Sequence, residues 1–344
     1  MPYQRNFDKR IRAAVIGAGS HCIRNILPTM NYLPVELVAV CDIDEEMARR
    51  TAKQYGAKAY TNTAALYAGE PELEAVFIAV GPRQHPAMVI DALCAGKHVW
   101  VEKPVAVRAA QVSEMIAARG DNIAVVGFKK AFMPATLKAK EVIDSEKYGH
   151  PNSILAVYHM CMPTNGREIL EKGETPNWLL NGVHPLAFMM AVGGPVDTVT
   201  THINAAGYGA VMLGYKNGCT GTLHLASGPM PNIEYYAVYS DQWELSVRDT
   251  RVELRRGIPF AYSETHNYAP AGDVSGTVVW DTTNCLATLE NKPEFTQGFF
   301  DEMNYFCGCV LENKQPDKGT LEMALDMMKV YEAALISDGT PVKI

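Results

Sequence analysis

The stretch IRAAVIGAGSHC, residues 11–22, decides the fold of the first part of this chain. A short apolar run, Ile11–Ile16, leads directly into two glycines. Gly17 permits a tight turn, and Gly19 lets the backbone approach a pyrophosphate at the N-terminus of the next helix, where free N–H groups favour an anion. Cys22 stands where the usual dinucleotide fingerprint has a third glycine, and it is still small enough for close packing of helix on strand. The stretch therefore predicts a strand, a turn and a helix that bind a dinucleotide.

The sequence on either side of this turn alternates β-rich runs with helical patterns up to about residue 130. Strands covered on both faces by crossover helices read as near-continuous apolar runs, and these do. The pattern predicts a doubly wound parallel α/β sheet, the Rossmann fold. The expected strands are Ile11–Ile16, Glu36–Cys41, Ala75–Ala79, His98–Val101 and Ile123–Phe128, and the expected helices are Asp44–Tyr55, Pro86–Ala95 and Ala109–Ala118.

From about residue 152 the pattern changes. A strand at 154–160 and a helix at Trp178–Val192 precede six alternating runs with polar or Gly-containing turns, which predict a largely antiparallel sheet. Residues 258–293 show little periodicity and predict an irregular, lid-like loop. We expect a NAD-binding domain at 1–130 and a second α/β domain at 131–344 with a large open, mainly antiparallel sheet. The six runs are 198–205, 209–215, 220–226, 235–240, 243–249 and 251–256, and helices 299–312 and 321–337 follow, the last of which is expected to pack back on the first domain.

Composition excludes several classes of protein. The 344 residues carry a net charge of −7, which argues against a nucleic-acid-binding surface. The apolar runs are too short to span a membrane, and the first ten residues lack the apolar segment of a secretory signal, so we expect them to form a short disordered arm. The eight cysteines show no zinc-ligand spacing. We therefore expect reduced thiols, no metal and a cytoplasmic location.

Asp42 is the predicted ribose ligand, because it ends the second strand 23 positions beyond Gly19, close to the spacing of about 20 in the fingerprint. A carboxylate there accepts hydrogen bonds from both ribose hydroxyls and repels a 2′-phosphate. Ile43 and Asp44 follow, and no arginine is adjacent, so NAD is favoured over NADP. The alternative is that Asp42 caps the helix of residues 45–55, a role that Asp44 can equally take.

Lys103 follows the fourth strand in Val101-Glu102-Lys103-Pro104. Ligands of open parallel sheets bind at the carboxyl ends of the strands, so Lys103 is expected near the nicotinamide. A partly desolvated lysine beside a cationic ring can lose its proton near neutral pH and act as a base. The alternative is a solvated surface lysine, the commonest environment of this residue.

With these motifs in place, the chain resembles the glucose–fructose oxidoreductase/inositol dehydrogenase family, often written Gfo/Idh/MocA. The resemblance runs nearly from end to end, and the segment GKHVWVEKP, residues 96–104, is its most specific part. The other matching segments are AAVIGAGSHCIRNILPTM, ELVAVCDID, AVFIAVGPRQHPAMVIDALCA, GFKKAFMPA, LLNGVHPLAFMMAVGG, QGFFDEMNYFCGCV and EAALISDGTPVKI. The resemblance implies a Rossmann domain followed by an α/β domain with a large open sheet, in a homodimer or homotetramer.

The resemblance also implies that Lys103 is the catalytic lysine and that His184 is the active-site histidine. The family commonly has an aspartate four residues before that histidine, but here the position holds Leu180, which can neither orient an imidazole nor accept a proton. Asn181 remains as a hydrogen-bonding group for a substrate hydroxyl or for His184. We therefore assign the base to Lys103 and a hydrogen-bonding or relay role to His184, with Glu102 positioning the lysine or the nicotinamide ribose.

His85 is expected either near the cofactor ribose, as the resemblance suggests, or as the cap of the helix that opens at Pro86. Tyr158 ends the first strand of the second domain, from where it can contact substrate. The substrate-binding prediction comprises Lys103, Tyr158, Asn181 and His184. The cofactor-binding prediction comprises Gly17, Gly19, Ser20, His21, Asp42, Ile43, Gly81, Pro82, His85, Glu102 and Lys103.

The function expected is hydride transfer between a nicotinamide cofactor and a secondary alcohol or ketone of a sugar, glycoside or cyclic polyol. One alternative is a glycoside-cleaving enzyme that keeps its NAD bound and recycles it without net redox change. A second alternative is a non-catalytic sensor of NAD or sugar, which the missing aspartate favours and the retained Lys103 and His184 oppose. Release of NADH, product without NADH, or binding without turnover distinguishes the three.

Overall fold

A computed structural model describes residues 6–145, 150–228, 234–241, 243–257, 276–282 and 292–344. Residues 1–5 of the predicted disordered arm lie outside this part of the chain. The chain divides into two compact units, each described by itself below. The first comprises Met1–Lys129, Gly173–Thr175 and Pro293–Met328, and the second comprises Lys130–Lys172, Pro176–Lys292 and Lys329–Ile344.

The first unit contains a six-stranded parallel sheet in the order β3-β2-β1-β4-β5-β6. This is the strand order of a dinucleotide-binding Rossmann sheet. From β1 the sheet grows in one direction through β2 and β3 and in the other through β4, β5 and β6, and ligands of such sheets bind at this switch point between β1 and β4. Its central side chains, such as Val15 and Phe77, are fully buried. The strands are β1 (Ile11–Ile16), β2 (Val35–Cys41), β3 (Lys58–Tyr60), β4 (Ala75–Ile78), β5 (His98–Glu102) and β6 (Ala124–Gly127).

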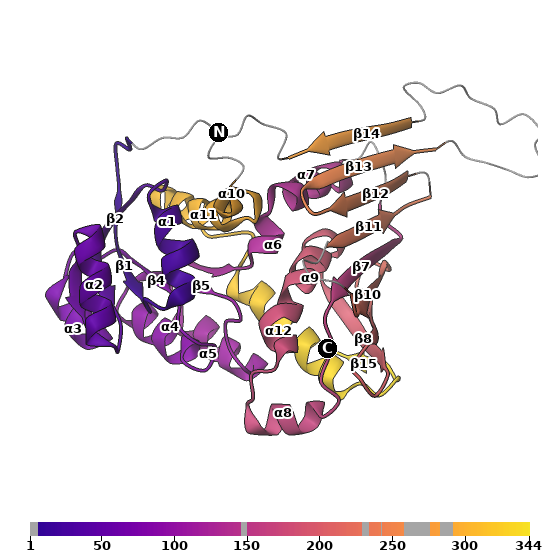
Figure 1. Cartoon of the computed structure of the whole chain (residues 1–344), viewed down its shortest axis with the longest axis horizontal. Helices are drawn as coiled ribbons and strands as arrows, with labels where there is room; N and C mark the ends of the chain where they lie inside the picture. Colours follow the sequence, from indigo (N-terminus) through magenta and orange to yellow (C-terminus); the bar gives the residue numbers. More distant parts are fainter. Residues whose placement is uncertain (1–5, 146–149, 229–233, 242, 258–275, 283–291) are drawn as a thin grey trace, which may run out of the picture. The chain divides into compact units, whose positions relative to one another are not determined.

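Helices cover both faces of this sheet. Figure 1 shows α4 and α5 below it in that view and α11 above it, and α11 packs against β1, β5 and β6. The helix after the glycine turn begins as a π-helix, η1 (Cys22–Ile26), and continues as α1 (Leu27–Met30). The others are α2 (Glu45–Tyr55), α3 (Thr63–Gly69), α4 (His85–Cys94), α5 (Ala109–Ala118), α10 (Pro293–Thr296) and α11 (Phe299–Glu312).

Strand β3 and helix α3 were not expected from the sequence. Strand β3 has three residues, none of them fully buried, and α3 buries one side chain, Leu66. Neither segment therefore carries a hydrophobic period long enough to identify it. The short helix α10 was not expected either, and the other strands and helices for which a range was predicted lie within a few residues of that range.

The second unit contains a nine-stranded sheet in the order β14-β13-β12-β11-β7-β10-β9-β8-β15. Only the pair β7 and β10 is parallel among its described pairings, so the predicted, mainly antiparallel sheet is confirmed. Its strands are β7 (Ser153–His159), β8 (Val196–Ile203), β9 (Gly209–Tyr215), β10 (Thr220–Ala226), β11 (Tyr235–Tyr239), β12 (Trp243–Arg248), β13 (Arg251–Arg256), β14 (Gly276–Asp281) and β15 (Val342–Lys343). Its helices are α7 (Pro134–Ile143), α8 (Gly166–Lys172) and α9 (Asn177–Gly193), while α6 (Lys129–Phe132) and α12 (Leu321–Ile336) contain residues of both units.

The predicted irregular loop at 258–293 is wrong in one part. Residues Gly276–Asp281 form β14, which pairs with β13 along its whole length. Val278 and Val279 are exposed on this edge strand, and the ring of Trp280 lies 5.5 Å from the Lys138 ammonium. Because β14 buries little apolar surface, its sequence lacks the alternation by which strands are recognised. The loop residues 258–275 and 283–291 lie outside the described part of the chain.

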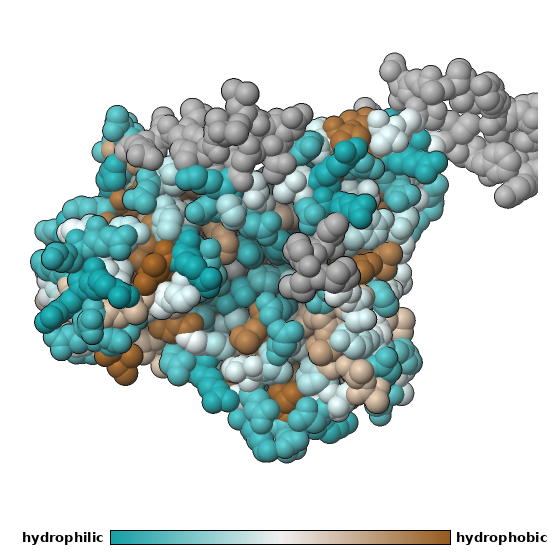
Figure 2. Space-filling view, viewed as in Figure 1, coloured by the Kyte–Doolittle hydropathy of each residue, from teal (hydrophilic) through white to brown (hydrophobic). Residues whose placement is uncertain are grey.

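The surface in Figure 2 is mostly hydrophilic, with hydrophobic residues scattered over it. None of the described helices is long and apolar enough to cross a membrane. The seven cysteines that the structure describes are all unpaired thiols. Within the same residues, no three His, Cys, Asp or Glu side chains are grouped so that they could hold a metal ion.

Candidate nucleotide and catalytic site

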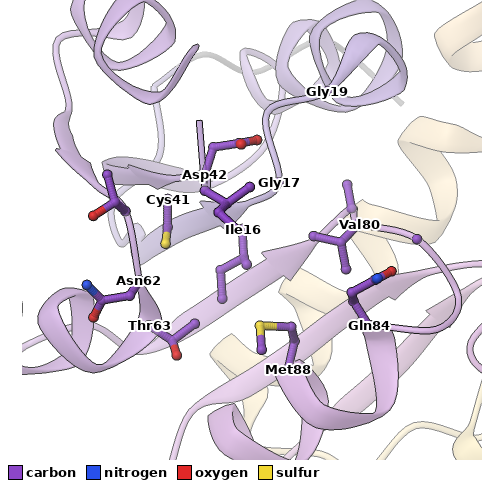
Figure 3. A pocket seen from close by; sticks show the side chains of 14 residues that line it. Ile16, Gly17, Gly19, Cys41, Asp42, Asn62, Thr63, Val80, Gln84 and Met88 are labelled. Carbon is purple, nitrogen blue, oxygen red and sulfur yellow. The ribbon is translucent and has the colours of Figure 1, made fainter. Parts of the chain in front are cut away.

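A pocket of about 650 Å³ lies in the first unit where β1, β2 and β4 end. Figure 3 shows Asn62 and Thr63 on one side of it, Val80, Gln84 and Met88 on the other, and Ile16 between them. The lining residues are Ile16, Gly17, Gly19, Cys41, Asp42, Ile43, Thr61, Asn62, Thr63, Ala79, Val80, Gly81, Gln84 and Met88. The pocket therefore occupies the position at which Rossmann sheets bind a dinucleotide.

The two glycines of the turn have different structural roles. Gly17 has φ +92°, and a Cβ on it would lie 2.6 Å from the Ala79 carbonyl oxygen. Both facts require glycine, because other residues rarely adopt this φ and the strand end of β4 leaves no room. A Cβ on Gly19 would meet nothing within 4 Å. The backbone of Gly19 therefore faces open space, as a turn that admits a phosphate requires.

Asp42 is held at the pocket by two backbone groups. Its Oδ2 accepts from the Ala18 N–H at 2.6 Å, and its Oδ1 accepts from the Asp44 N–H at 2.9 Å. The cap of α2 is Asp44, whose Oδ1 accepts from the Met47 N–H. Asp42 is thus not the helix cap. Each of its carboxylate oxygens keeps a second lone pair available to a ribose hydroxyl.

Other pocket residues were not identified from the sequence. Thr61, Asn62 and Thr63 follow the unexpected strand β3, and Gln84 and Met88 belong to the start of α4. A usable signal existed for one of them, because Asn62 precedes a helix-forming run and caps α3 by accepting from the Ala65 N–H. Ile43, which was predicted, is 93% exposed at the pocket rim. An exposed isoleucine there offers an apolar surface to a planar base.

A second group of polar side chains lies at the carboxyl end of β5. Glu102 is buried, and its Oε1 lies 2.8 Å from His21 Nε2. The Asn25 amide nitrogen donates to His21 Nδ1 at 3.0 Å. With Nδ1 accepting, the proton of the neutral ring is on Nε2 and is donated to Glu102. The helix after the glycine turn is thereby tied to the residue that precedes Lys103.

Lys103 is partly buried, and burial lowers the pKa of its amine, while the charges of Glu102 and Glu302 act in the opposite direction. A lysine in this environment is closer to the neutral form than a solvated lysine. The alternative that Lys103 is a fully solvated surface lysine is therefore wrong. This neutral form is the one that can accept a proton.

His85 is fully buried and is the first residue of α4. Its Nδ1–H donates to the Pro104 carbonyl at 2.8 Å, and burial lowers the pKa of the ring to about 4. The expectation that it caps α4 is wrong, since the cap position is Gln84 and no side chain caps this helix. His85 instead holds the backbone that follows Lys103.

The predicted substrate residues of the second unit lie on two of its elements. Tyr158 is near the end of β7, and burial, followed by the charge of Glu234, raises the pKa of its hydroxyl. Asn181 and the buried His184 lie on α9, where the Asn181 amide donates to Asn177 Oδ1. Leu180 lies one helical turn before His184, at the position where the sequence departs from the family pattern.

Comparison with known proteins agrees with this geometry. Residues 11–128 match the model of the Gfo/Idh/MocA oxidoreductase family, which describes an NAD-binding Rossmann fold. The match to this family thus covers the strands and helices of the first unit up to residue 128. An inositol 2-dehydrogenase from Acidothermus cellulolyticus is 33% identical over 151 residues, which are 42% of this chain and 43% of that protein. The chain thus matches less than half of the length of this relative.

Solved structures extend the likeness to the second unit. An oxidoreductase from Agrobacterium radiobacter, solved with NAD⁺, L-tartaric acid and magnesium, superimposes with a TM-score of 0.78 at 19% identity, over 97% of this chain and 98% of that one. A putative NADPH-dependent oxidoreductase from Desulfitobacterium hafniense gives a TM-score of 0.77 at 19% identity, over 98% of both chains. At such identities the likeness shows the fold, which confirms a Rossmann domain followed by an α/β domain with a large open sheet.

The structure brings only part of the predicted cofactor set to the pocket. Gly17, Gly19, Asp42, Ile43 and Gly81 line it. The other members, which do not line this pocket, remain predictions: Ser20, His21, Pro82, His85, Glu102 and Lys103.

Proposed function

We propose that this protein is an NAD-dependent oxidoreductase that transfers a hydride between the cofactor and a secondary alcohol or ketone of a sugar, glycoside or cyclic polyol. The observation that carries the proposal is the partly buried Lys103 amine at the carboxyl end of β5, in the unit that contains the NAD-binding domain. The substrate class is supported by the inositol 2-dehydrogenase that resembles this chain.

The pocket residues fit a dinucleotide. Gly17 and Gly19 leave the backbone free to approach a pyrophosphate, and Asp42 is oriented by two N–H groups toward the ribose position. The carboxylate of Asp42 disfavours a 2′-phosphate, which supports NAD over NADP. When bound, NAD supplies the hydride acceptor for alcohol oxidation.

Lys103 is the proposed acid–base group. In the oxidation direction its neutral amine accepts the hydroxyl proton of the substrate, and in the reverse direction its ammonium returns that proton. Glu102 holds the segment in place through its hydrogen bond with His21. His85 does the same from the other side through the Pro104 carbonyl.

The second unit contributes the remaining residues of the proposal. We assign His184 to hydrogen bonding or proton relay with the substrate, and Asn181 and Tyr158 to binding of its hydroxyl groups. Leu180 cannot serve as a second base, so Lys103 is the only proton acceptor that this assignment uses. A homodimer or homotetramer in the cytoplasm is the proposed assembly and location.

The test is an activity panel with purified protein. Sugars, polyols including inositols, and glycosides are supplied with NAD⁺ or NADP⁺, and NADH absorbance and product mass are followed together. We expect NADH release with a subset of these substrates and a loss of kcat/KM of about 10²–10⁴-fold in Lys103→Ala. Lys97→Ala is the matched control, since Lys97 precedes the opposite end of the same strand and should retain activity.

Three outcomes overturn parts of the proposal. Wild-type kcat/KM in both Lys103→Ala and His184→Ala contradicts the assigned residues. Product without NADH indicates the cofactor-recycling reaction. Saturable NAD binding without turnover of any substrate indicates a sensor.

A further inference from the structure

A buried ion pair joins two distant segments of the second unit. The ammonium of Lys130, in α6, lies 2.9 Å from Glu234 Oε1. Glu234 directly precedes β11, and its Oε2 accepts a hydrogen bond from the Tyr236 hydroxyl at 3.0 Å. Each carboxylate oxygen of Glu234 therefore has a donor within the protein, and the two donors together fix the orientation of the group.

The backbone of Glu234 is fixed as well. The Asp249 N–H donates to the Glu234 carbonyl at 3.1 Å, and the Glu234 N–H donates to Asp249 Oδ1 at 3.3 Å. The two side chains of the ion pair differ in exposure, which is 4% for Lys130 and 18% for Glu234. The part of the ion pair that a ligand can reach is therefore the carboxylate and not the ammonium.

Glu234 lies opposite Tyr158 across the sheet. Tyr235 pairs with Val157, and extending this antiparallel register by one residue brings Glu234 opposite Tyr158. The Cβ atoms of directly opposed residues are about 4.5–5.5 Å apart and on the same face of the sheet. Burial, followed by the charge of Glu234, raises the pKa of the Tyr158 hydroxyl, so the phenol keeps its proton near pH 7 and can donate it to an acceptor.

This carboxylate is on the sheet face that α9 covers. Phe188 of α9 stacks on the Tyr236 ring with the centroids 4.0 Å apart. Tyr236 and Glu234 are two residues apart, so their side chains point to the same face of the sheet. His184 lies one helical turn before Phe188 and so shares its side of α9. The carboxylate thus belongs to the same face of the second unit as the predicted substrate residues Tyr158 and His184.

The charges on this face favour some ligands over others. The positive charge of Lys130 is already paired and shielded from water, so it offers little attraction to an acidic ligand. The exposed carboxylate of Glu234 repels anions, while each of its oxygens keeps a lone pair for a hydroxyl donor. Two neighbouring hydroxyl groups match this arrangement, since one can accept from Tyr158 and the other can donate to Glu234.

We propose that Glu234 is a specificity-determining residue that accepts a hydrogen bond from a hydroxyl group of a neutral polyol or sugar and excludes acidic sugars. This inference rests on the proposed function for the hydroxyl-bearing class of substrate, and it deepens that function by naming the group that selects within the class. Binding of the hydroxyl group does not itself require hydride transfer, so the two can be tested separately.

The test compares neutral ligands with acidic ligands of the same ring. The pairs are myo-inositol with myo-inositol 1-phosphate, glucose with glucuronate, and galactose with galacturonate. Binding to protein saturated with NADH is followed by saturation-transfer-difference NMR, and turnover with NAD⁺ is followed by absorbance. We expect wild type to bind the neutral member of at least one pair more tightly than the acidic member.

The decisive variant is the double substitution Lys130→Met/Glu234→Gln, which removes both charges and so leaves no buried ammonium without a partner. We expect its affinity for the neutral member to fall about 10-fold, the loss that follows from removing a hydrogen bond to a charged group. The ratio of neutral to acidic affinity should fall by at least the same factor, because the repulsion of the acid is removed as well.

The controls separate ligand binding from a structural role. Glu253→Gln removes the acid of an exposed ion pair with Arg251 on β13 and should leave the ratio as in wild type. Glu234→Gln alone should melt at a lower temperature than the double variant, because Lys130 then stays buried without its counter-charge. A purely structural role of the ion pair would lower both affinities equally and leave their ratio unchanged.

The outcomes distinguish this inference from the proposed function. The same ratio in wild type and in the folded double variant overturns the inference, as does a wild type that prefers the acidic members or binds none of these compounds. Binding that weakens in the double variant, without turnover in wild type, refutes the proposed function and leaves the role of Glu234 intact. Turnover that requires Lys103, with an unchanged ratio in the double variant, refutes the role of Glu234 alone.

Discussion

At the scale of single residues, Asp42 and Asp44 show how two neighbouring acids take different tasks. Asp44 caps the N-terminus of α2, because its side chain accepts a hydrogen bond from the Met47 N–H in the first turn. Asp42 accepts from the Ala18 and Asp44 N–H groups and borders the pocket. The difference arises because Asp42 directly follows the buried end of β2 next to the glycine turn, whereas Asp44 lies at a helix start exposed to solvent.

We predict that Asp42→Ala weakens NAD binding by about 10-fold or more, since hydrogen bonds to a charged group contribute about 1.5–3 kcal/mol. Binding of NADP should weaken less or improve, because the repulsion of its 2′-phosphate is removed. Titration of both cofactors by intrinsic fluorescence or calorimetry measures the ratio. Asp44→Ala is the control, and it should cost about 1 kcal/mol of stability without changing the cofactor preference. An unchanged ratio in Asp42→Ala contradicts the ribose assignment.

At the scale of elements, helix α4 is attached to the segment after β5 through a buried imidazole. The Nδ1–H of His85 donates to the Pro104 carbonyl, and burial lowers the pKa of the ring to about 4 from 6.5. Between these two pH values the unfolded chain binds the proton and the folded chain does not. Stability contributed by this group is therefore present above pH 6.5 and is lost as the pH falls toward 4.

We predict that wild-type protein loses about 2 kcal/mol of unfolding free energy between pH 7 and pH 5 through His85 alone. His85→Gln should be less stable at pH 7, because the bond to the Pro104 carbonyl is weakened, but it should lose correspondingly less on acidification. Urea unfolding at the two pH values measures both effects. Replacing the exposed His224 on β10 by glutamine should leave the pH dependence as in wild type. An equal acid loss in His85→Gln would show that His85 is protonated in the folded state.

At the scale of the whole molecule, one chain forms two compact units, and its C-terminal segment contributes residues to both of them. Residues Pro293–Met328 belong to the first unit, although they follow the strands of the second. The bond from the Val126 N–H to the Gly319 carbonyl and the ion pair of Arg119 with Glu322 join this late segment to the first 129 residues. A fragment ending near residue 130 therefore lacks α11, which covers β1, β5 and β6.

We predict that NAD stabilises the full chain by mass action. At about 100 times its dissociation constant, a ligand that binds only the folded state adds about 2.7 kcal/mol, which raises the melting temperature of the first unit by several degrees. Differential scanning fluorimetry with increasing NAD⁺ measures the shift, and NADP⁺ at the same concentrations should give a smaller one. The absence of a shift with either cofactor, in a chain that melts cooperatively, would contradict binding in the pocket.

The sequence by itself determined the glycine turn, Asp42 and most strands and helices, because these depend on neighbouring residues and on local hydrophobic periodicity. The apolar run Ile11–Ile16 predicts a strand, and Gly17 directly after it predicts a tight turn. Strands β3 and β14 were not predicted, because a strand that is very short or mostly exposed shows no hydrophobic periodicity.

Only the tertiary structure decided which distant groups meet. The hydrogen bond of His21 with Glu102, that of His85 with the Pro104 carbonyl, and the place of Glu302 at the end of β6 join residues that are far apart in the sequence. Their burial sets their charge states, since the desolvation of an ionisable group depends on everything packed around it and not on its neighbours along the chain.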